Sequence, residues 1–378
     1  MLEELSLRNF KSARDLSIPI ASLTVLAGLN GSGKSTALQA IALIKQTLDA
    51  SPKCDQLVLR GRLVRLGRSE DAQFEGAETE EIIFGLKTTS GQAKLICTAT
   101  PRADTLPARC EGDMPATAAN LFEGFQFIQA DRLTPATQYL QASTPEQESG
   151  WLGCRGEFTV DYLQRNADTK VSLKRVCSHD QNAVPADLYK QVAPTDNLLD
   201  QTAGWLQQLS PGVRPRAVAV ELADATSLRF EYTGTKLDST SRQYRPSNVG
   251  FGLTYSLPII VACLSAKRGS LLLLENPEAH LHPRGQSALG LLLARCAADG
   301  VQVIVETHSD HVLNGIRVAA KRGEIASGDV AVHFFSRNIE TGESTRASPV
   351  LLSNGRFSDW PSGFFDEWSK ALDELLGD

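Results

Sequence analysis

The first hundred residues pass from a strand-like pattern of hydrophobic and polar positions to a helical one and back. Alternation in the first twenty residues predicts two strands, and the continuous apolar run LTVLA (23–27) predicts a buried strand. Apolar residues recur at helical spacing over 35–48. Residues 54–100 return to a strand-like pattern that ends in a hairpin around Thr89-Ser90-Gly91, so we expect an antiparallel β subdomain here.

The last third of the chain alternates between helical and strand patterns. We expect helices at 252–266, 285–298 and 309–320, separated by the apolar strands LLLLE (271–275) and VQVIVE (301–306). This βαβα order is typical of a parallel sheet with helices packed against it. The chain is therefore predicted to have an α/β fold built mainly on a parallel sheet.

Four segments follow from these patterns. The first ends with the short apolar strand GFQFIQ (124–129), and the second is mixed and polar, with helix-like pieces. The third begins with a predicted hairpin (217–232), and the fourth has two strands, a turn and a closing helix. We therefore expect, in chain order, the N-terminal half of a main domain (1–134), a helical insertion lobe (135–215), the C-terminal half of the main domain (216–330) and a small C-terminal domain (331–378).

The composition narrows the class of protein. Hydrophobic residues make up 42% and charged residues 22% of the 378 residues, as in ordinary globular proteins. The net charge of −6 argues against broad coating of nucleic acid, although a local basic groove is compatible with it. The seven cysteines form no C-x-x-C pair, the N-terminus lacks a signal peptide, and the longest apolar run (253–266) is too short to span a bilayer. We expect a cytoplasmic protein without a membrane partner.

A glycine-rich motif lies between the buried strand and the first helix. GLNGSGKS (28–35) matches G-x-x-x-x-G-K-[ST], whose glycines let backbone N–H groups face phosphates at a helix N-terminus. We expect Lys34 to reach the β- and γ-phosphates of ATP, the Ser35 hydroxyl to bind Mg²⁺, and Thr36 to contact the α-phosphate. The residues assigned to the nucleotide here are Gly28, Asn30, Gly31, Ser32, Gly33, Lys34, Ser35 and Thr36.

Two predicted strand tips carry further polar residues. Glu275 ends the LLLLE strand, at the edge of the sheet where ligands bind, and is predicted to hold Mg²⁺ through water. His308 follows the VQVIVE strand and is predicted to sense or polarise the γ-phosphate. The simpler interpretations of this second tip are a helix N-cap at Ser309 or Asp310 and a structural imidazole.

The group that takes a proton from an attacking water is harder to assign. Asn276 follows Glu275, and an amide cannot accept that proton near neutral pH. Glu278 is close in sequence, but a turn forced by Pro277 aims it away from the nucleotide, toward a partner chain. In folds that carry such a glycine-rich phosphate-binding loop (P-loop), we expect the VQVIVE strand to lie between LLLLE and the LTVLA strand that precedes the loop. This order puts Glu306 beside Asn276 at a strand spacing of about 4.8 Å. Glu306 would then accept the proton while Asn276 orients the water, and a helix cap or an ion pair is the alternative role for Glu306.

Together, GLNGSGKST, LLLLENPEAHLHP and ETHSDHVLNGIR resemble the motifs of ABC-type P-loop ATPases of the RecF/SMC/OLD group, which include ATPase subunits of antiphage defence systems. LRNFKSARDL near the N-terminus is similar to the N-F-K-S turn that opens those proteins. DWPSGFFDEW near the C-terminus is similar to an uncharacterised domain on small bacterial ATPases of this group. The resemblance covers most of the chain apart from about residues 135–215.

The resemblance implies a head-to-head homodimer, or a higher homo-oligomer, that encloses two ATP molecules with Mg²⁺. Each ATP would meet the P-loop of one chain and a signature segment of the other. Here the signature candidate is SNVGFG (247–252), which opens a predicted helix. Ser247, Gly250 and Gly252 are its candidate nucleotide contacts.

Other assignments follow from the resemblance or compete with it. Gln129, with Gln126 as its rival, would complete the Mg²⁺ shell, and Lys11 or Arg14 would lie near the nucleotide. Zinc binding is the competing interpretation for four histidines, His280, His282, His308 and His311.

The resemblance also implies a function. An ATP-driven switch would close on ATP, open after hydrolysis and control a separately encoded effector, such as a nuclease, in bacterial antiphage defence. A DNA-repair ATPase that binds DNA is an alternative within the same group. Asn276 favours a different class, a scaffold that binds ATP and hydrolyses it slowly or not at all. A small-molecule kinase fits less well, since such enzymes lack the strand-tip histidine and the signature segment.

Overall fold

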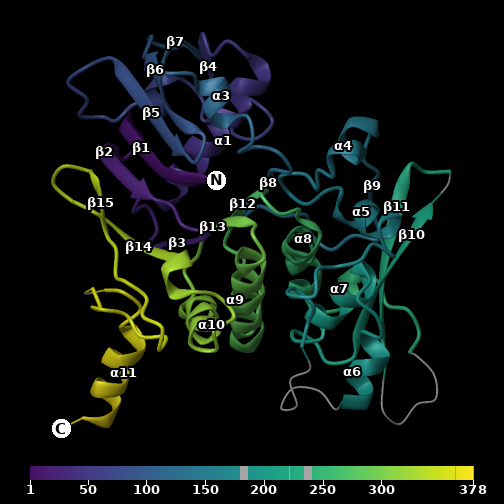
Figure 1. Ribbon diagram of the computed structural model, residues 1–378. Coiled ribbons are helices and arrows are strands. Elements are labelled where there is room, and N and C mark those ends of the chain that lie inside the picture. The colour runs from purple at the N-terminus through teal and green to yellow at the C-terminus, as the bar shows by residue number, and fades with distance from the viewer. Residues whose placement is uncertain (179–185, 221, 234–240, 362, 378) are drawn as a thin grey trace.

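The computed structural model describes residues 1–178, 186–220, 222–233, 241–361 and 363–377. A mainly parallel sheet lies between an antiparallel β subdomain and a group of helices (Figure 1). An insertion lobe extends to one side of the parallel sheet, and the C-terminal segment extends to the other (Figure 1). This arrangement confirms the predicted α/β class. No helix among the described residues is long and apolar enough to cross a membrane.

The central sheet consists of β3 (Leu23–Gly28), β8 (Gln126–Ile128), β12 (Leu271–Glu275), β13 (Gln302–Glu306), β14 (Val330–Arg337) and β15 (Ser344–Ala347). Their order is β15-β14-β3-β13-β12-β8, and every neighbouring pair is parallel except the hairpin of β14 and β15. The predicted place of β13, between β12 and the P-loop strand β3, is confirmed. The register pairs Glu275 with Glu306, so these two strand tips lie side by side.

Helices cover the central sheet on both faces, as its continuously apolar strands require. They are α1 (Lys34–Ala50), α8 (Phe251–Ser265), α9 (Pro283–Ala298) and α10 (Asp310–Lys321). Leu272 and Leu274 of β12 pack in a core with α8, α9 and α10, whereas Leu271 and Leu273 pack in a second core with α1 and the antiparallel subdomain. This division follows from the alternation of side chains along a strand. The predicted helices of the last third are confirmed.

The antiparallel subdomain contains β1 (Leu2–Phe10), β2 (Ala13–Pro19), β4 (Gln56–Val58), β5 (Glu81–Thr88), β6 (Gly91–Thr98) and β7 (Thr105–Glu111), with the short helices α2 (Ser69–Ala72) and α3 (Met114–Ala118). The strand order is β2-β1-β5-β6-β7-β4. β5 and β6 form the hairpin predicted around Thr89-Ser90-Gly91, with Thr88 opposite Gly91. The subdomain was therefore predicted correctly.

The insertion lobe differs from the prediction. It contains the helices α4 (Thr144–Ser149), α5 (Thr159–Arg165), α6 (Ala186–Val192) and α7 (Leu198–Leu206) and the strands β9 (Gln138–Leu140), β10 (Val213–Val220) and β11 (Ala225–Tyr232). The three strands form a sheet in the order β10-β11-β9. The expected boundary between residues 215 and 216 thus falls inside β10, and the lobe is not purely helical. Local alternation predicted the β10–β11 hairpin, but its pairing with β9 is long-range and leaves no local pattern.

The C-terminal boundary also shifts. β14 begins at Val330 and pairs with the P-loop strand β3, so the first strand of the expected domain 331–378 belongs to the central sheet. After β15 the chain makes the predicted turn near Gly355, where Leu351 bridges Phe357, and ends in α11 (Glu367–Leu376). The short elements η1 (Pro246–Asn248) and η2 (Ser327–Asp329) are 3₁₀ turns.

A buried histidine ties the C-terminal segment to the antiparallel subdomain. His333 of β14 is 2% exposed, its Nε2 lies 2.7 Å from the Pro19 carbonyl oxygen, and its Nδ1 lies 2.8 Å from Ser348 Oγ. Because a carbonyl only accepts, Nε2 donates to Pro19 and Nδ1 accepts from Ser348. Burial lowers the pKa of His333 to about 4, so the imidazole is neutral at neutral pH.

This histidine predicts an acid-sensitive contribution to stability. His333 protonates in the unfolded chain below about pH 6.5 but in the folded chain only near pH 4, so the free energy of unfolding falls as the pH decreases through this window. The expected loss is up to about 3 kcal/mol. Urea unfolding from pH 7 to pH 4 should show a steeper pH dependence for the wild-type chain than for His333→Gln. Equal slopes for the two chains would contradict the prediction.

Candidate functional site

The glycine-rich loop joins β3 to α1, and at two of its glycines there is no room for a side chain. Gly28 has a φ of +140°, and a Cβ at this position would lie 2.3 Å from the Phe335 carbonyl oxygen. Gly33 has a φ of +99°, and its Cβ would lie 2.2 Å from Ser344 Oγ. Both positions therefore require glycine. The obstructing atoms belong to β14 at Gly28 and to β15 at Gly33.

Lys34 and Ser35 lie at the start of α1 and face the tip of β13. Lys34 is 3% exposed, its Nζ donates to the Leu29 carbonyl oxygen at 2.8 Å, and it lies 3.8 Å from Glu306 Oε1. Burial lowers the pKa of Lys34, and the nearby carboxylates of Glu306 and Glu278 oppose this shift. Ser35 Oγ donates to Glu306 Oε1 at 3.0 Å. The loop and the strand tip are thus in direct contact.

Glu275 and Asn276 form the tip of β12. The Glu275 carboxylate accepts a hydrogen bond from the Ala130 amide at 3.0 Å, and burial raises its pKa to about 7. The backbone N–H of Asn276 donates to the backbone carbonyl oxygen of Glu306 at 2.9 Å, which confirms the predicted position of Glu306 beside Asn276. Asn276 has a φ of +45°, a left-handed conformation that asparagine tolerates better than most residues.

The two candidate bases have different surroundings. Glu306 is 5% exposed, burial raises its pKa, and its Oε2 is buried without a hydrogen-bond partner among the described residues. In contrast, both oxygens of Glu278 accept hydrogen bonds at 2.7 Å, one from Thr307 Oγ1 and one from the His308 amide. The turn at Pro277 therefore aims Glu278 at the tip of β13, and Glu278 does not line the nucleotide cavity. Glu278 positions that tip, whereas Glu306 keeps one oxygen available.

A cavity of about 850 Å³ lies above the loop and the strand tips. Ten residues expected near the nucleotide line it: Lys11, Asn30, Gly31, Gly33, Lys34, Ser35, Thr36, Asn276, Glu306 and His308. Gly28, Ser32, Glu275 and Glu278 are not among the residues that line it. Of the two basic candidates near the N-F-K-S turn, Lys11 lines the cavity, whereas Arg14 pairs with Glu78 at 2.8 Å on an exposed surface.

The glutamine candidates do not line this cavity. Gln129 Nε2 donates to the Leu63 carbonyl oxygen at 2.7 Å. Gln126 donates to the Gly150 carbonyl oxygen at 2.9 Å and accepts from the Leu152 amide at 3.1 Å. The structure therefore brings neither side chain to Ser35. The register of β8 with β12 nevertheless places Gln129 directly after Ile128, which pairs with Leu274, and thus near the tip of β12.

The signature segment lies at the start of α8, outside the cavity of its own chain. Ser247 and Gly250 are exposed, and a Cβ at Gly250 would meet nothing within 4 Å. Gly252 is buried, and its Cβ would lie 2.6 Å from the His280 carbonyl oxygen. The segment thus presents a free surface at Ser247 and Gly250, while Gly252 sets the packing of the helix.

The histidines proposed as alternative zinc ligands have other surroundings. The His280 ring packs against Phe251 and Tyr255, with centroid distances of 4.6 and 4.9 Å. His282 caps α9, and His311 lies 3.6 Å from Asp310. Within the described part of the chain, no three His, Cys, Asp or Glu side chains are grouped as metal ligands.

Sequence reasoning missed a buried arginine that joins three parts of the site. Arg132 is 1% exposed and donates to the carbonyl oxygens of Gln129 at 3.0 Å, Glu275 at 2.8 Å and Asn276 at 2.7 Å. Its guanidinium lies over the Tyr255 ring of the signature helix, 4.5 Å from the centroid. Arg132 lies in a polar stretch of sequence, which gives no signal of burial. It connects the end of β8, the tip of β12 and α8.

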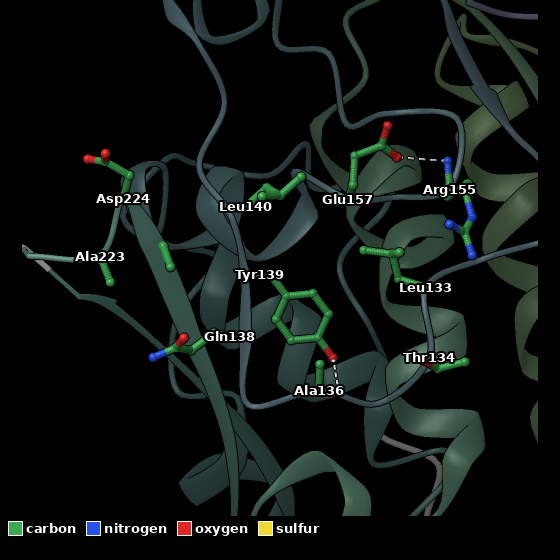
Figure 2. Close-up of a pocket in the computed structure, with 11 residues that line it drawn as sticks. Leu133, Thr134, Ala136, Gln138, Tyr139, Leu140, Arg155, Glu157, Ala223 and Asp224 are labelled. Carbon is green, nitrogen blue, oxygen red and sulfur yellow. Dashed lines mark hydrogen bonds between the residues drawn. The ribbon is translucent and has the colours of Figure 1, made fainter.

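A second cavity, of about 560 Å³, lies in the insertion lobe (Figure 2). Tyr139 points into it, and the Tyr139 hydroxyl accepts from the Ala136 amide at 3.0 Å. The Arg155 amide donates to Glu157 Oε2 at 2.9 Å on the same wall. None of the residues assigned to the nucleotide lines this cavity, so we place the functional site at the P-loop.

The P-loop site fits a nucleotide with a divalent cation. Three buried polar atoms around it have no hydrogen-bond partner among the described residues: Ser32 Oγ, Asn276 Oδ1 and Glu306 Oε2. Uncompensated buried polar groups are costly, and a ligand that supplies donors or a cation relieves this cost. Ser35 and Glu275 carry oxygen atoms, the type of ligand that Mg²⁺ prefers.

Comparison with known families agrees with this site. Residues 1–103 match a family described as "AAA ATPase domain", and residues 188–314 match "AAA domain, putative AbiEii toxin, Type IV TA system". Residues 325–375 match "Protein of unknown function (DUF3696)". An OLD nuclease from Thermus scotoductus (strain ATCC 700910 / SA-01) is 22% identical over 328 residues, 82% of this chain. The chain spans 59% of the length of that curated relative.

Two solved structures of Smc heads share the fold. One is an Smc head domain with an extended coiled coil, bound to the C-terminal domain of ScpA derived from Pyrococcus furiosus; it has a TM-score of 0.51 and 15% identity and covers 100% of this chain and 99% of its own. The other is an SmcHead bound to the C-winged helix domain of ScpA, with a TM-score of 0.50, 15% identity and coverage of 93% and 98%. The site and the family matches support a P-loop ATPase of the RecF/SMC/OLD type, and the Smc heads share its fold.

Proposed function

We propose that this protein binds and hydrolyses ATP with Mg²⁺ and that ATP joins two copies of the chain. The main support is the contact of Glu306 with Lys34 and Ser35, next to the backbone of Asn276. At this contact four groups lie together in the wall of a cavity of about 850 Å³: the ammonium of Lys34, the hydroxyl of Ser35, the amide of Asn276 and the carboxylate of Glu306. One oxygen of that carboxylate has no hydrogen-bond partner among the described residues.

The residues divide the work in this proposal. Ser35 and Glu275 hold Mg²⁺, which neutralises charge on the phosphates when it is bound. Lys34 binds the β- and γ-phosphates, and His308 contacts the γ-phosphate. Asn276 orients the attacking water, and Glu306 accepts its proton at Oε2. The raised pKa of Glu306 suits this role because an efficient base has a pKa closer to neutrality than an exposed carboxylate has.

Gln129 belongs to the proposal as a third ligand of the metal shell. Its side-chain amide is engaged with Leu63, so this role requires the side chain to turn from Leu63 toward Ser35. The binding of ATP and Mg²⁺ would supply the oxygen and the charge that favour the turn.

The dimer is proposed because the signature segment is exposed at Ser247 and Gly250 and lies outside the cavity of its own chain. A second copy of the chain would place these residues on the nucleotide. The proposal extends to control of a separately encoded effector in antiphage defence, on the resemblance of the motif set to ATPase subunits of such systems. Asn276 favours the alternative of a scaffold that binds ATP with slow or no turnover.

Removal of the P-loop ammonium should abolish nucleotide binding. Lys34→Ala deletes the cation that faces the β- and γ-phosphates, so we expect at least a 100-fold loss of ATP affinity, or about 2.7 kcal/mol, by titration calorimetry with Mg²⁺. Lys45→Ala is the matched control, because Lys45 lies on the same helix and pairs with Asp49 outside the cavity. ATP affinity equal to wild type in Lys34→Ala would refute the site.

Dimerisation should depend on the signature segment of the other chain. Gly250→Arg places a long side chain on an open surface, so the variant should bind ATP through its own P-loop but fail to pair. Gly328→Arg adds the same side chain at another open, exposed glycine and should pair normally. Sedimentation velocity with a non-hydrolysable ATP analogue separates the two states. A normal ATP-dependent dimer of Gly250→Arg would contradict the proposed assembly.

A further inference from the structure

The turn between β14 and β15 lines the nucleotide cavity, although no nucleotide motif predicts it. Arg337 at the end of β14 and Thr341 and Gly342 in the turn contribute to the cavity wall. We call residues 337–343 the hairpin turn. It lies within the segment 325–375 that matches a family of unknown function.

Hydrogen bonds of Ser344, the residue that follows the hairpin turn, hold the turn against the P-loop. Ser344 is 3% exposed, and its Oγ donates to the Ser32 carbonyl oxygen at 2.8 Å and accepts from Ser12 Oγ at 2.7 Å. The Ser344 backbone amide donates to the Ser12 carbonyl oxygen at 2.8 Å. A side chain on Gly33 would collide with Ser344. The position of the turn is therefore coupled to the backbone of the P-loop.

The strand order places the hairpin turn opposite the catalytic end of the cavity. β3 has β13 on one side and β14 on the other, so Glu306 and Arg337 flank the P-loop from opposite sides. Glu306 and His333 both pair with Leu26, so Arg337 lies four residues further along the sheet than Glu306. With strands about 4.8 Å apart and a rise of about 3.3 Å per residue, the backbones of Glu306 and Arg337 are separated by about 16 Å. The proposed function puts the γ-phosphate at Glu306, which leaves the Arg337 side of the cavity for the nucleoside of ATP.

The chemistry at this end suits a nucleoside. Arg337 Nε donates to the Gly342 carbonyl oxygen at 3.1 Å, and no hydrogen bond or ion pair engages its two Nη groups among the described residues. Phe74 and Glu75 also line the cavity. The planar guanidinium of Arg337 and the ring of Phe74 are groups that can contact a base. The hydroxyl of Thr341 and the exposed carboxylate of Glu75 are groups that can hydrogen-bond to the hydroxyls of a ribose.

We propose that the hairpin turn and the segment around Phe74 form the nucleoside subsite, with Arg337 as the residue that positions the ribose and base. The inference rests on the proposed function and extends it to the C-terminal segment. Because β14 continues through Phe334, which packs against Phe364, the C-terminal segment is joined directly to the wall of the subsite. A nucleotide bound at this subsite would therefore contact the hairpin of β14 and β15, the same hairpin that packs against the C-terminal segment.

The test compares ligands with and without a nucleoside. Titration calorimetry with Mg²⁺ should show that Arg337→Ala weakens binding of ATP and ADP about tenfold, as expected for the loss of a charged hydrogen bond. Binding of inorganic tripolyphosphate should not change. Arg337→Lys should recover part of the loss. Arg322→Ala is the matched control, since Arg322 is exposed and does not line the cavity.

Hydrogen exchange on the wild-type chain provides a readout that needs no variant. Amides of residues 338–344 should gain protection with Mg²⁺ and ATP but not with Mg²⁺ and tripolyphosphate. Equal protection with both ligands, unchanged ATP affinity of Arg337→Ala, or an equal loss for ATP and tripolyphosphate would each overturn the subsite. These outcomes leave the P-loop assignment intact, whereas a wild-type chain that binds neither ligand would overturn the proposed function itself.

Discussion

The hydrogen bond from Ser35 to Glu306 is the interaction on which the rest of the site depends. It joins the first turn of α1 to the tip of β13, two elements that are 271 residues apart in the chain. The contact requires β13 to lie directly beside the P-loop strand, and it requires the register that places Glu306 opposite Leu26. A shift of one residue would turn Glu306 to the other face of the sheet. The buried apolar strands therefore set the geometry of the polar site.

The same burial creates an electrostatic demand. The half-buried Glu275 and the buried Glu306 are adjacent carboxylates, and partial burial together with the repulsion from Glu306 raises the pKa of Glu275 to about 7. Lys11 and Lys34 lie close enough to offset part of this charge, and burial lowers the pKa of both. Two carboxylates held beside two desolvated lysines form an arrangement that a phosphate chain and a divalent cation complete. Such a ligand would also supply partners to the buried polar atoms of the site, Ser32 Oγ, Asn276 Oδ1 and Glu306 Oε2, which have none among the described residues.

The sequence predicted the elements of the site better than the directions of its side chains. The strand tips of Glu275 and Glu306 were predictable because continuous apolar runs specify buried parallel strands, and the order of β3, β13 and β12 followed from the fold class. Gln129 and Glu278 were placed on the right segments, but their hydrogen bonds to Leu63 and to the tip of β13 depend on tertiary packing.

Arg132 and the hairpin turn were missed for a related reason. Arg132 acts through three backbone carbonyl groups that have no sequence identity of their own, so no motif marks it. Arg337 reaches the cavity only because β14 pairs with β3 across some 300 residues of sequence, which the expected boundary at residue 331 concealed. Long-range contacts, rather than local pattern, decide both positions: hydrogen bonds to backbone carbonyl groups for Arg132 and strand pairing for Arg337.

The most direct test of the account is single-turnover hydrolysis of ATP by variants of the two candidate bases. Glu306→Gln should bind ATP with normal affinity but slow the chemical step at least about 100-fold, because the free oxygen that accepts the proton is lost. Glu278→Gln should have a smaller effect, since Glu278 uses both oxygens to hold Thr307 and His308. If Glu278→Gln is the slower variant, or if neither variant alters the rate, Glu306 is not the base and the account is contradicted.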